Sequence, residues 1–324
     1  MEKLQLGPSG PEVSCLCLGT DLFGTKRDKA TSYRLLDVFR EHGGTFVDTA
    51  NFYASWMPGF SGGNSETVIG QWLLDRGARD QMVISSKLGF DYPGSPGGLT
   101  ASEIERECEK SLRRLHTDRL DMYWAHRDDR ETPLEETLEA FDRLIQSGKV
   151  RAIGASNVRT WRVAQSLTVS RTNGWHSYTA VQQRYTYLHP MPAADFGPQI
   201  FIADELKDLA STTGIALVAY SVLLSGAYEK GVDALPPQFA GADTASRLEA
   251  LHEVSREAGA TVNQVIIAWM RQSTPAILPI IAGSSPEQLT ENIQALRLRL
   301  SPELMDRLDT AGVVAGKQGW LQPT

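Results

Sequence analysis

Eight short apolar runs recur along the 324 residues of this chain, and longer segments with apolar residues at helical spacing separate them. Apolar runs without polar alternation are typical of parallel strands that are buried on both faces. Eight strand-then-helix units predict an α/β protein that closes into a (β/α)8 TIM barrel. The predicted strands are Cys15–Gly19, Thr45–Thr49, Met82–Ser86, Leu120–Ala125, Val150–Ala155, Thr179–Gln182, Ile215–Ala219 and Ala276–Ala282.

An open, doubly wound sheet is the competing fold, and it usually carries a glycine-rich phosphate loop after its first strand. The segment Gly19–Gly24 lacks that pattern, which favours the closed barrel. No composition change marks a domain boundary, so we expect a single barrel domain over residues 1–324. The turn residues within Lys3–Val13 predict a small hairpin under the barrel. Gly226–Ala245, after the seventh strand, is too long for an ordinary turn, and the sequence leaves its role open.

Acidic residues outnumber basic ones, 39 to 32, which gives a formal net charge of −7. That balance argues against nucleic acid or an anionic membrane as the main partner. The N-terminal residues lack the layout of a signal peptide, and no apolar run is long enough to cross a bilayer. Cys15 and Cys17 lack the spacing of a redox or zinc pair and read as packed thiols. We expect a soluble cytoplasmic protein; its oligomeric state stays open, and a monomer is compatible with the sequence.

Polar residues follow the predicted strands, at the end of the barrel where enzymes of this fold carry their active sites. Strand ends emerge into water, so each of these residues taken alone has an ordinary structural explanation. The combination of Tyr53 with Lys87, Asp48 and His126 is more specific. A phenol is a poor proton donor at neutral pH unless a neighbouring ammonium lowers its pKa. A carboxylate keeps that ammonium charged, and an imidazole can orient a carbonyl oxygen by a hydrogen bond.

These segments resemble the aldo-keto reductase superfamily, and the likeness runs in order through almost the whole chain. The matching segments are Phe46–Tyr53, Ser85–Lys87, Leu120–His126, Gly148–Asn157, Val181–Gln182, Ala219–Ser221 and Ala282–Asn292. The resemblance implies an oxidoreductase that uses NADPH to reduce a small-molecule aldehyde or ketone. It also implies a catalytic set of Asp48, Tyr53, Lys87 and His126, with Tyr53 as the proton donor.

The resemblance further implies where the cofactor binds. Ser156, Asn157 and Gln182 match positions that hold the nicotinamide carboxamide, and Tyr220 matches the aromatic residue that stacks on the ring. The remaining implied cofactor contacts are Thr20 at the first strand end, Ser221 and Leu223 in the pyrophosphate segment, and Gly283, Ser285, Gln288, Glu291 and Asn292 at the adenosine half.

Two departures from the family pattern affect the cofactor. Many relatives carry a Lys or Arg in the adenosine segment for the 2′-phosphate of NADPH, and here none precedes Arg297. Arg247 or Lys230 from the long loop are candidates for that charge, and NADH stays an alternative cofactor. The pyrophosphate segment Val222–Tyr228 also lacks the usual proline- and glycine-rich pattern.

The substrate pocket is expected above the nicotinamide. Candidates for its apolar wall are Phe23, Trp56, Phe90 and Trp124, which flank strand ends. Two other functions compete with a reductase. A cofactor-binding regulatory subunit like the β-subunits of potassium channels uses the same scaffold, and a barrel lyase would use Lys87 as a Schiff-base nucleophile. Six scattered histidines without ligand spacing predict no metal site.

Overall fold

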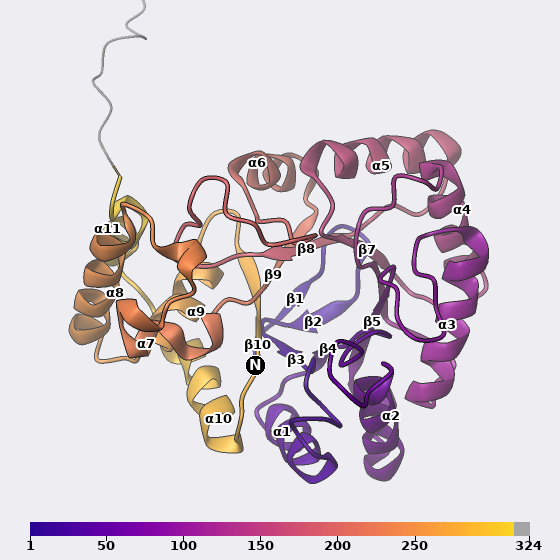
Figure 1. The fold of residues 1–324 in the computed structure, drawn as a ribbon, viewed down its shortest axis with the longest axis horizontal. Coiled ribbons are helices and arrows are strands. Elements are labelled where there is room, and N and C mark those ends of the chain that lie inside the picture. Colours follow the sequence, from indigo (N-terminus) through magenta and orange to yellow (C-terminus); the bar gives the residue numbers. More distant parts are fainter. Residues whose placement is uncertain (314–324) are drawn as a thin grey trace, which may run out of the picture.

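The computed structural model describes residues 1–313 and confirms the predicted barrel (Figure 1). Eight parallel strands close in the order β10-β3-β4-β5-β6-β7-β8-β9. Each lies within a few residues of a predicted strand, while residues 314–324 of the expected domain lie outside the described part. The barrel strands are β3 (Cys17–Gly19), β4 (Phe46–Asp48), β5 (Val83–Leu88), β6 (Met122–Ala125), β7 (Ile153–Ser156), β8 (Ala180–Arg184), β9 (Ala216–Tyr220) and β10 (Ile277–Ile281).

Helices surround the barrel, and α8 and α11 pack against each other outside this ring (Figure 1). Within residues 1–313, no helix has both the length and the apolar character to span a bilayer. The helices are α1 (Lys29–Glu41), α2 (Asn64–Arg76), α3 (Ala101–Leu115), α4 (Leu134–Gln146), α5 (Thr160–Asn173), α6 (Asp204–Thr213), α7 (Ala227–Lys230), α8 (Thr244–Ala258), α9 (Val262–Gln272), α10 (Pro286–Gln294) and α11 (Pro302–Thr310).

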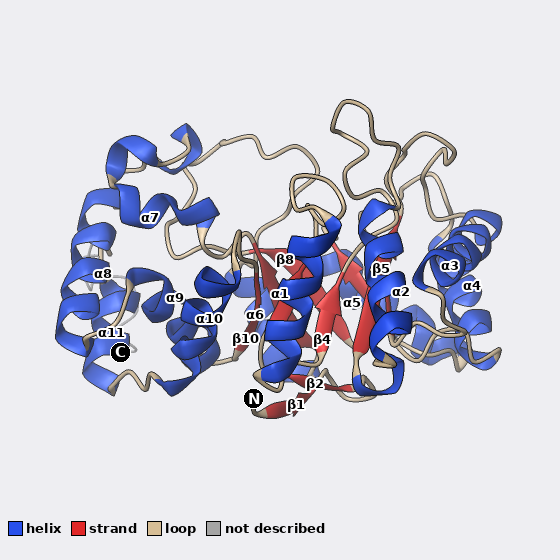
Figure 2. Ribbon diagram, turned by 90° about the horizontal axis from the view of Figure 1, so that it is seen from below, coloured by secondary structure: helices blue, strands red, loops and turns tan. Residues whose placement is uncertain are grey.

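The predicted N-terminal hairpin is present, and it covers one end of the barrel. Strands β1 (Lys3–Gln5) and β2 (Glu12–Ser14) pair antiparallel at the end opposite the long loops (Figure 2). Gly7 has a φ of +75°, and a Cβ there would lie 1.9 Å from Thr179 O. Only glycine fits this close approach. The barrel is therefore closed below and accessible above.

Alternate residues of the strands pack into two separate apolar cores. Leu18 and Val47 face the helices, whereas Cys17 and Phe46 belong to the smaller cluster inside the barrel. Trp124 fills this interior opposite Gly154, where a Cβ would come within 2.4 Å of the indole ring. Parallel strands buried on both faces explain the continuous apolar runs in the sequence. The filled interior places any site above it, at the strand ends.

The long segment Gly226–Ala245 folds into short helical turns instead of an open loop. It contains α7, the turns Val232–Ala234 and Pro237–Phe239, and the start of α8. Tyr228 is fully buried, and its hydroxyl oxygen accepts a hydrogen bond from the backbone N–H of Tyr187 at 3.0 Å. This contact anchors the segment to the chain that follows β8.

Candidate active site

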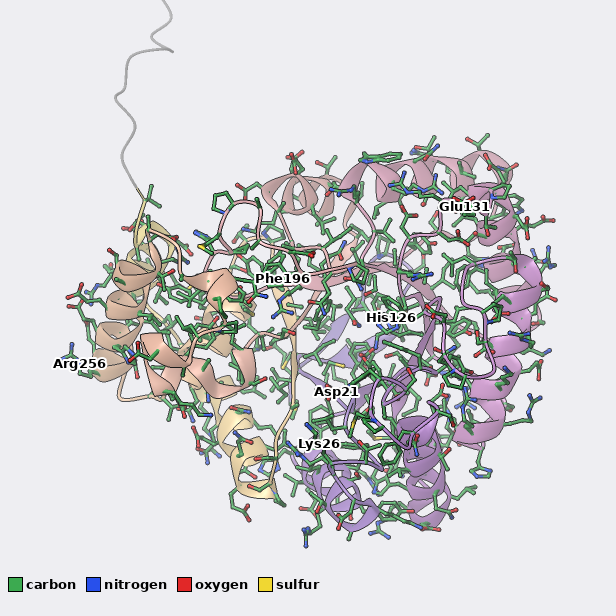
Figure 3. All side chains as sticks on the ribbon, viewed as in Figure 1. Asp21, Lys26, His126, Glu131, Phe196 and Arg256 are labelled. Atoms are coloured by element: carbon green, nitrogen blue, oxygen red, sulfur yellow. The ribbon has the colours of Figure 1, made fainter. Side chains whose placement is uncertain are left out.

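A cavity of about 710 Å³ opens at the carboxyl-terminal end of the barrel strands. Asp48 at the end of β4, Gln182 in β8 and Tyr220 at the end of β9 line it together. Asp21 and His126 lie over the centre of the barrel (Figure 3) and also line this cavity. The structure thus brings residues from distant strand ends to one place, as the barrel fold requires.

Lys87 lies beneath the cavity with no exposed surface, and its ammonium group is fully partnered. The Nζ atom forms an ion pair with Asp48 and donates hydrogen bonds to Thr49 O at 2.9 Å and to Tyr53 Oη at 2.7 Å. An ammonium has three hydrogens and cannot accept, so these contacts use its whole donor capacity. The buried charge is compensated, as an ion withdrawn from water requires.

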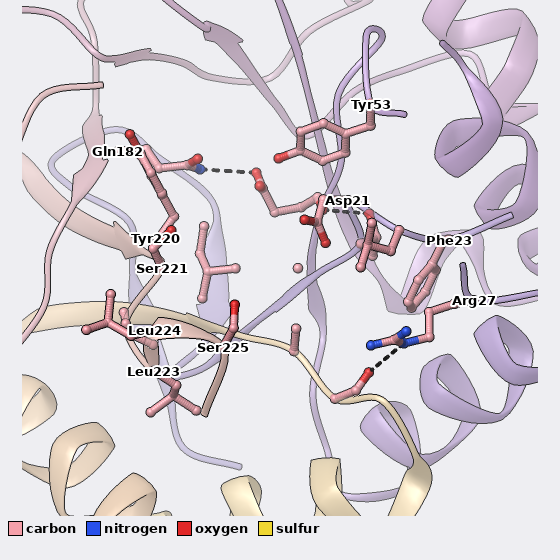
Figure 4. Close-up of a pocket in the computed structure, with 18 of the residues that line it drawn as sticks. Asp21, Phe23, Arg27, Tyr53, Gln182, Tyr220, Ser221, Leu223, Leu224 and Ser225 are labelled. Carbon is pink, nitrogen blue, oxygen red and sulfur yellow. Dashed lines mark hydrogen bonds between the residues drawn. The ribbon is translucent and has the colours of Figure 1, made fainter. Parts of the chain in front are cut away.

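Tyr53 lies in the turn after β4 and presents its hydroxyl to the cavity (Figure 4). Because Lys87 donates to Tyr53 Oη, the phenol acts as acceptor in that bond. Its own O–H hydrogen has no acceptor among residues 1–313. The hydrogen is therefore available to a ligand in the cavity.

The pKa of Tyr53 lies well above its usual value near 10 because burial disfavours the phenolate and because Asp48 and Asp21 add negative charge. The sequence pattern predicts a pKa lowered by the neighbouring ammonium, and that direction is wrong. The ammonium of Lys87 is already paired with Asp48, so little net positive charge acts on the phenol. Tyr53 consequently carries its proton at pH 7. The raised pKa makes the phenol a weaker acid, and the hydrogen bond from Lys87 is the contact that favours the phenolate when the proton leaves.

His126 is a neutral imidazole beside this phenol. Burial and the nearby Lys87 charge hold the pKa of His126 well below its usual value near 6.5. Its ring stands nearly edge-on to Tyr53, with ring centroids 6.0 Å apart. Within the described part of the chain Nδ1 is buried without a hydrogen-bond partner, which leaves Nε2 as the nitrogen that can reach a ligand.

Asp48 connects Lys87 with the side of the cavity where the cofactor is expected. Its Oδ1 accepts hydrogen bonds from Ser85 Oγ at 2.7 Å and from Gln182 Nε2 at 3.2 Å, while Oδ2 pairs with Lys87. Thr20 also lines the cavity and donates from its hydroxyl to Asp48 O at 2.8 Å. The carboxylate is thus held from several sides, so its position relative to Lys87 is fixed.

The residues expected around the nicotinamide lie together at the ends of β7, β8 and β9. Asn157, in a left-handed conformation with a φ of +57°, donates from Nδ2 to His126 O at 2.9 Å. Its Oδ1 accepts from Tyr220 Oη at 2.7 Å, which fixes the Tyr220 ring in the cavity wall. Ser156 is fully buried behind Asn157 and is not part of the wall.

The segment after β9 has an unusual backbone. Ser221, Leu224 and Ser225 all have positive φ values, of 58°, 45° and 56°. Left-handed conformations cost energy in residues other than glycine and concentrate at ligand sites. The whole stretch from Tyr220 to Gly226, which includes Leu223, lines the cavity. This geometry fits the expected pyrophosphate segment despite its unusual sequence.

The start of α10 forms the far end of the cavity. Gly283, Gln288 and Asn292 line it, and Oδ1 of Asn292 is buried without a hydrogen-bond partner among residues 1–313. Ser285 caps the helix by accepting from Gln288 N at 3.3 Å and lies outside the lining, as does Glu291. The helix N-terminus favours an anionic part of a ligand here, whereas the unpaired Asn292 oxygen needs a hydrogen-bond donor.

Aromatic rings form the wall next to Tyr53. Phe52 stacks on Phe90 with ring centroids 4.7 Å apart and lies 5.2 Å from Trp56, which is 52% exposed at the rim. Phe23 contributes from the loop after β3. Three further lining residues were not predicted from the sequence. Phe52 has the pattern of an ordinary loop aromatic residue, and the loop residues Pro198 and Gln199 carry no sequence signal.

Trp124 does not line the cavity, so the expectation that it forms part of the substrate wall is corrected. Its side chain points into the barrel, as that of His126 does two residues later in the chain. Trp124 lies one layer further from the cavity. Trp124 is a packing residue of the interior.

Arg247 and Lys230, the expected sources of charge for the cofactor, also lie away from the cavity. Arg247 is buried, and its guanidinium donates to Tyr187 O at 2.9 Å and to Ala311 O at 3.1 Å. Lys230 is exposed at the end of α7. Arg27, in the loop before α1, lines the cavity instead.

Comparison with known proteins agrees with this geometry. Residues 15–312 match the Aldo/keto reductase family. The "Uncharacterized oxidoreductase YrpG" of Bacillus subtilis is 32% identical over 95% of each chain. A norsolorinic acid reductase of Aspergillus flavus is 30% identical over 94% of this chain and 79% of its own. An aryl-alcohol dehydrogenase of Pestalotiopsis microspora is 29% identical over 94% of this chain and 80% of its own.

Proposed function

Because the chain belongs to the Aldo/keto reductase family, we propose that it reduces the carbonyl group of an aldehyde or ketone to an alcohol. Tyr53 donates the proton to the carbonyl oxygen. A nicotinamide dinucleotide supplies the hydride when bound, as in the family. The protein's part is to bind and orient the reactants and to stabilise the charge that develops on oxygen.

One observation carries this proposal: Lys87 donates to Tyr53, so the phenol hydrogen is directed away from the lysine and toward the cavity. As the proton leaves, the phenolate gains a full charge-assisted hydrogen bond from the same ammonium. Lys87 therefore acts most strongly after proton transfer has begun, which is when stabilisation lowers the barrier.

His126 orients the carbonyl. Its neutral imidazole has one N–H donor, and we assign that hydrogen to Nε2 because Nδ1 is enclosed without an acceptor. Nε2 and Tyr53 Oη can then both donate to one carbonyl oxygen. Two donors at the developing oxyanion act as a preformed stabilising site.

We propose NADPH as the cofactor. The Tyr220 face, the Asn157 and Gln182 amides and the strained segment after β9 would hold its nicotinamide and pyrophosphate parts, and the start of α10 its adenosine part. The absence of Lys and Arg from the α10 part of the lining makes NADH the alternative.

The aromatic wall indicates the class of substrate. Phe52, Phe90 and the exposed ring of Trp56 offer flat apolar surfaces beside Tyr53, which suit an aromatic aldehyde or ketone. One relative is named as an aryl-alcohol dehydrogenase, and an aryl group is an aromatic ring.

The test is a fluorescence titration with NADPH and NADH, followed by an assay of reduced-cofactor absorbance with matched aromatic and aliphatic carbonyls. We expect turnover, with a higher kcat/KM for the aromatic than for the aliphatic compounds. In the Trp56→Ala variant the ratio of these two kcat/KM values should be smaller. Tight cofactor binding without any turnover would support a regulatory subunit instead. Borohydride trapping of a substrate on Lys87 would support the lyase.

A further inference from the structure

Arg27 is the one Lys or Arg side chain in the cavity lining within residues 1–313. The proposed proton transfer from Tyr53 gives this side chain no role. We propose that Arg27 pairs with a phosphate of the bound dinucleotide and supplies the positive charge that α10 lacks. The inference rests on the proposed function, because it needs a dinucleotide in this cavity.

The backbone around Arg27 is held from both sides. Its N–H donates to Leu22 O at 3.0 Å, and its carbonyl accepts from Thr25 N at 3.2 Å and from Ser32 Oγ at 3.1 Å. The next residue, Asp28, caps α1 by accepting from Thr31 N. The guanidinium therefore extends from a fixed base, which lowers the entropy lost when it binds a ligand.

The guanidinium itself is poorly satisfied by the protein. Nε lies 3.5 Å from Gly283 O, and among the described residues no carboxylate forms an ion pair with Arg27. A guanidinium has five N–H donors in a planar fork that matches phosphate, so four remain for a ligand. Figure 4 shows Arg27 across the cavity from Leu223 and Ser225. Gly283, whose carbonyl oxygen faces Arg27 Nε, lies shortly before the start of α10. Arg27 thus lies between the segments expected to hold the pyrophosphate and the adenosine.

The charge balance of the cavity supports this assignment. Asp48 is neutralised by Lys87, but Asp21 also lines the cavity and has no ion-pair partner within the described residues. Burial raises the pKa of the Asp21 carboxyl above its usual value, and the positive charges of Lys87 and Arg27 partly offset this rise. Without Arg27, the dinucleotide phosphates would meet a cavity with a net negative charge.

Arg27→Gln is the direct test, with Lys26→Gln as the matched control. Lys26 is the adjacent cation of the same loop, but it is exposed and does not line the cavity (Figure 3). Cofactor Kd is measured by fluorescence for NADPH and NADH at several salt concentrations. We expect Arg27→Gln to weaken binding by about 10- to 100-fold, the range of a hydrogen bond to a charged group. Lys26→Gln should stay within about twofold of wild type.

Comparing the loss of affinity for NADPH and NADH identifies which phosphate Arg27 contacts. A loss confined to NADPH assigns Arg27 to the 2′-phosphate, and an equal loss for both cofactors assigns it to the pyrophosphate. In either case Arg27→Lys should recover part of the affinity, and Arg27→Gln should show a weaker salt dependence of the cofactor Kd.

Two results would overturn the inference. Arg27→Gln could bind both cofactors as tightly as wild type, which leaves the proposed function intact. Alternatively, Arg27→Lys could lose as much affinity as Arg27→Gln at an unchanged salt dependence, which would make Arg27 a positioning residue of its loop. A wild-type protein that binds neither cofactor would instead contradict the proposed function itself, and this inference with it.

Discussion

Around Lys87, the polar groups of the cavity already have partners within the protein, whereas around Arg27 they do not. The Lys87 ammonium uses all three hydrogens, and both oxygens of Asp48 accept hydrogen bonds. At the other end, the Arg27 fork is mostly unused and Asn292 has a buried acceptor without a donor. On the proposed function, the half of the cavity around Lys87 and Tyr53, the acid half, is fixed before a ligand binds. A bound dinucleotide would complete the half around Arg27 and α10, the phosphate half. The two halves should therefore respond differently to substitution.

Lys87→Met should have the largest effect, because it breaks the closed network of the acid half. It leaves the buried carboxylate of Asp48 without its counterion, which costs about 3–5 kcal/mol in the free energy of unfolding. It also removes the donor to Tyr53, so carbonyl reduction should fall by at least about 100-fold. Urea unfolding and the reduced-cofactor assay measure these two losses.

The double variant Asp48→Asn with Lys87→Met separates stability from activity. With both charges removed, part of the lost stability should return, because no buried charge is left unpaired. Activity should stay low. A double variant as unstable as Lys87→Met would show that the ion pair is not what organises this half.

His126 gives the acid half a pH signature. Its pKa in the folded protein lies well below the unfolded value near 6.5, so only the unfolded chain gains this proton as the pH falls. Stability from His126 is complete above about pH 6.5 and declines below it, by up to about 1.4 kcal/mol per pH unit. His126→Gln should remove that part of the decline in urea unfolding at pH 7, 6 and 5. Parallel curves for the two proteins would contradict a buried neutral imidazole.

Ser225 in the phosphate half should have the smallest effect. Its φ of 56° suits glycine, so Ser225→Gly should leave stability and cofactor Kd nearly unchanged. Ser225→Val places a β-branched side chain in a left-handed conformation, which costs about 1–2 kcal/mol. Cofactor Kd should rise by about tenfold at most, with kcat retained. A loss of kcat equal to that of Lys87→Met would show that the two halves are not separate.

Periodicity made the strands predictable because a parallel strand buried on both faces is a continuous apolar run. The positions of Asp48, Lys87 and His126 near strand ends then predicted where these side chains meet, since enzymes of the barrel fold carry their sites at that end. Depth inside the barrel was not predictable: Trp124 and His126 share a direction, and sequence spacing does not say which layer reaches the cavity. Phe52 and Arg27 lie on loops, whose conformation has no period. The upward pKa shift of Tyr53 depends on the Lys87–Asp48 pairing, which only the packed structure shows.

In the proposed function, the free hydroxyl hydrogen of Tyr53 is the proton that reduction requires. The most direct measurement compares wild type and Tyr53→Phe in single-turnover reduction of an aromatic aldehyde, with cofactor Kd measured on the same samples. The phenylalanine keeps the ring and removes only the hydroxyl. We predict a rate about 10²- to 10⁴-fold lower, with cofactor Kd within about twofold of wild type. A Tyr53→Phe variant that turns over at the wild-type rate would contradict the assignment.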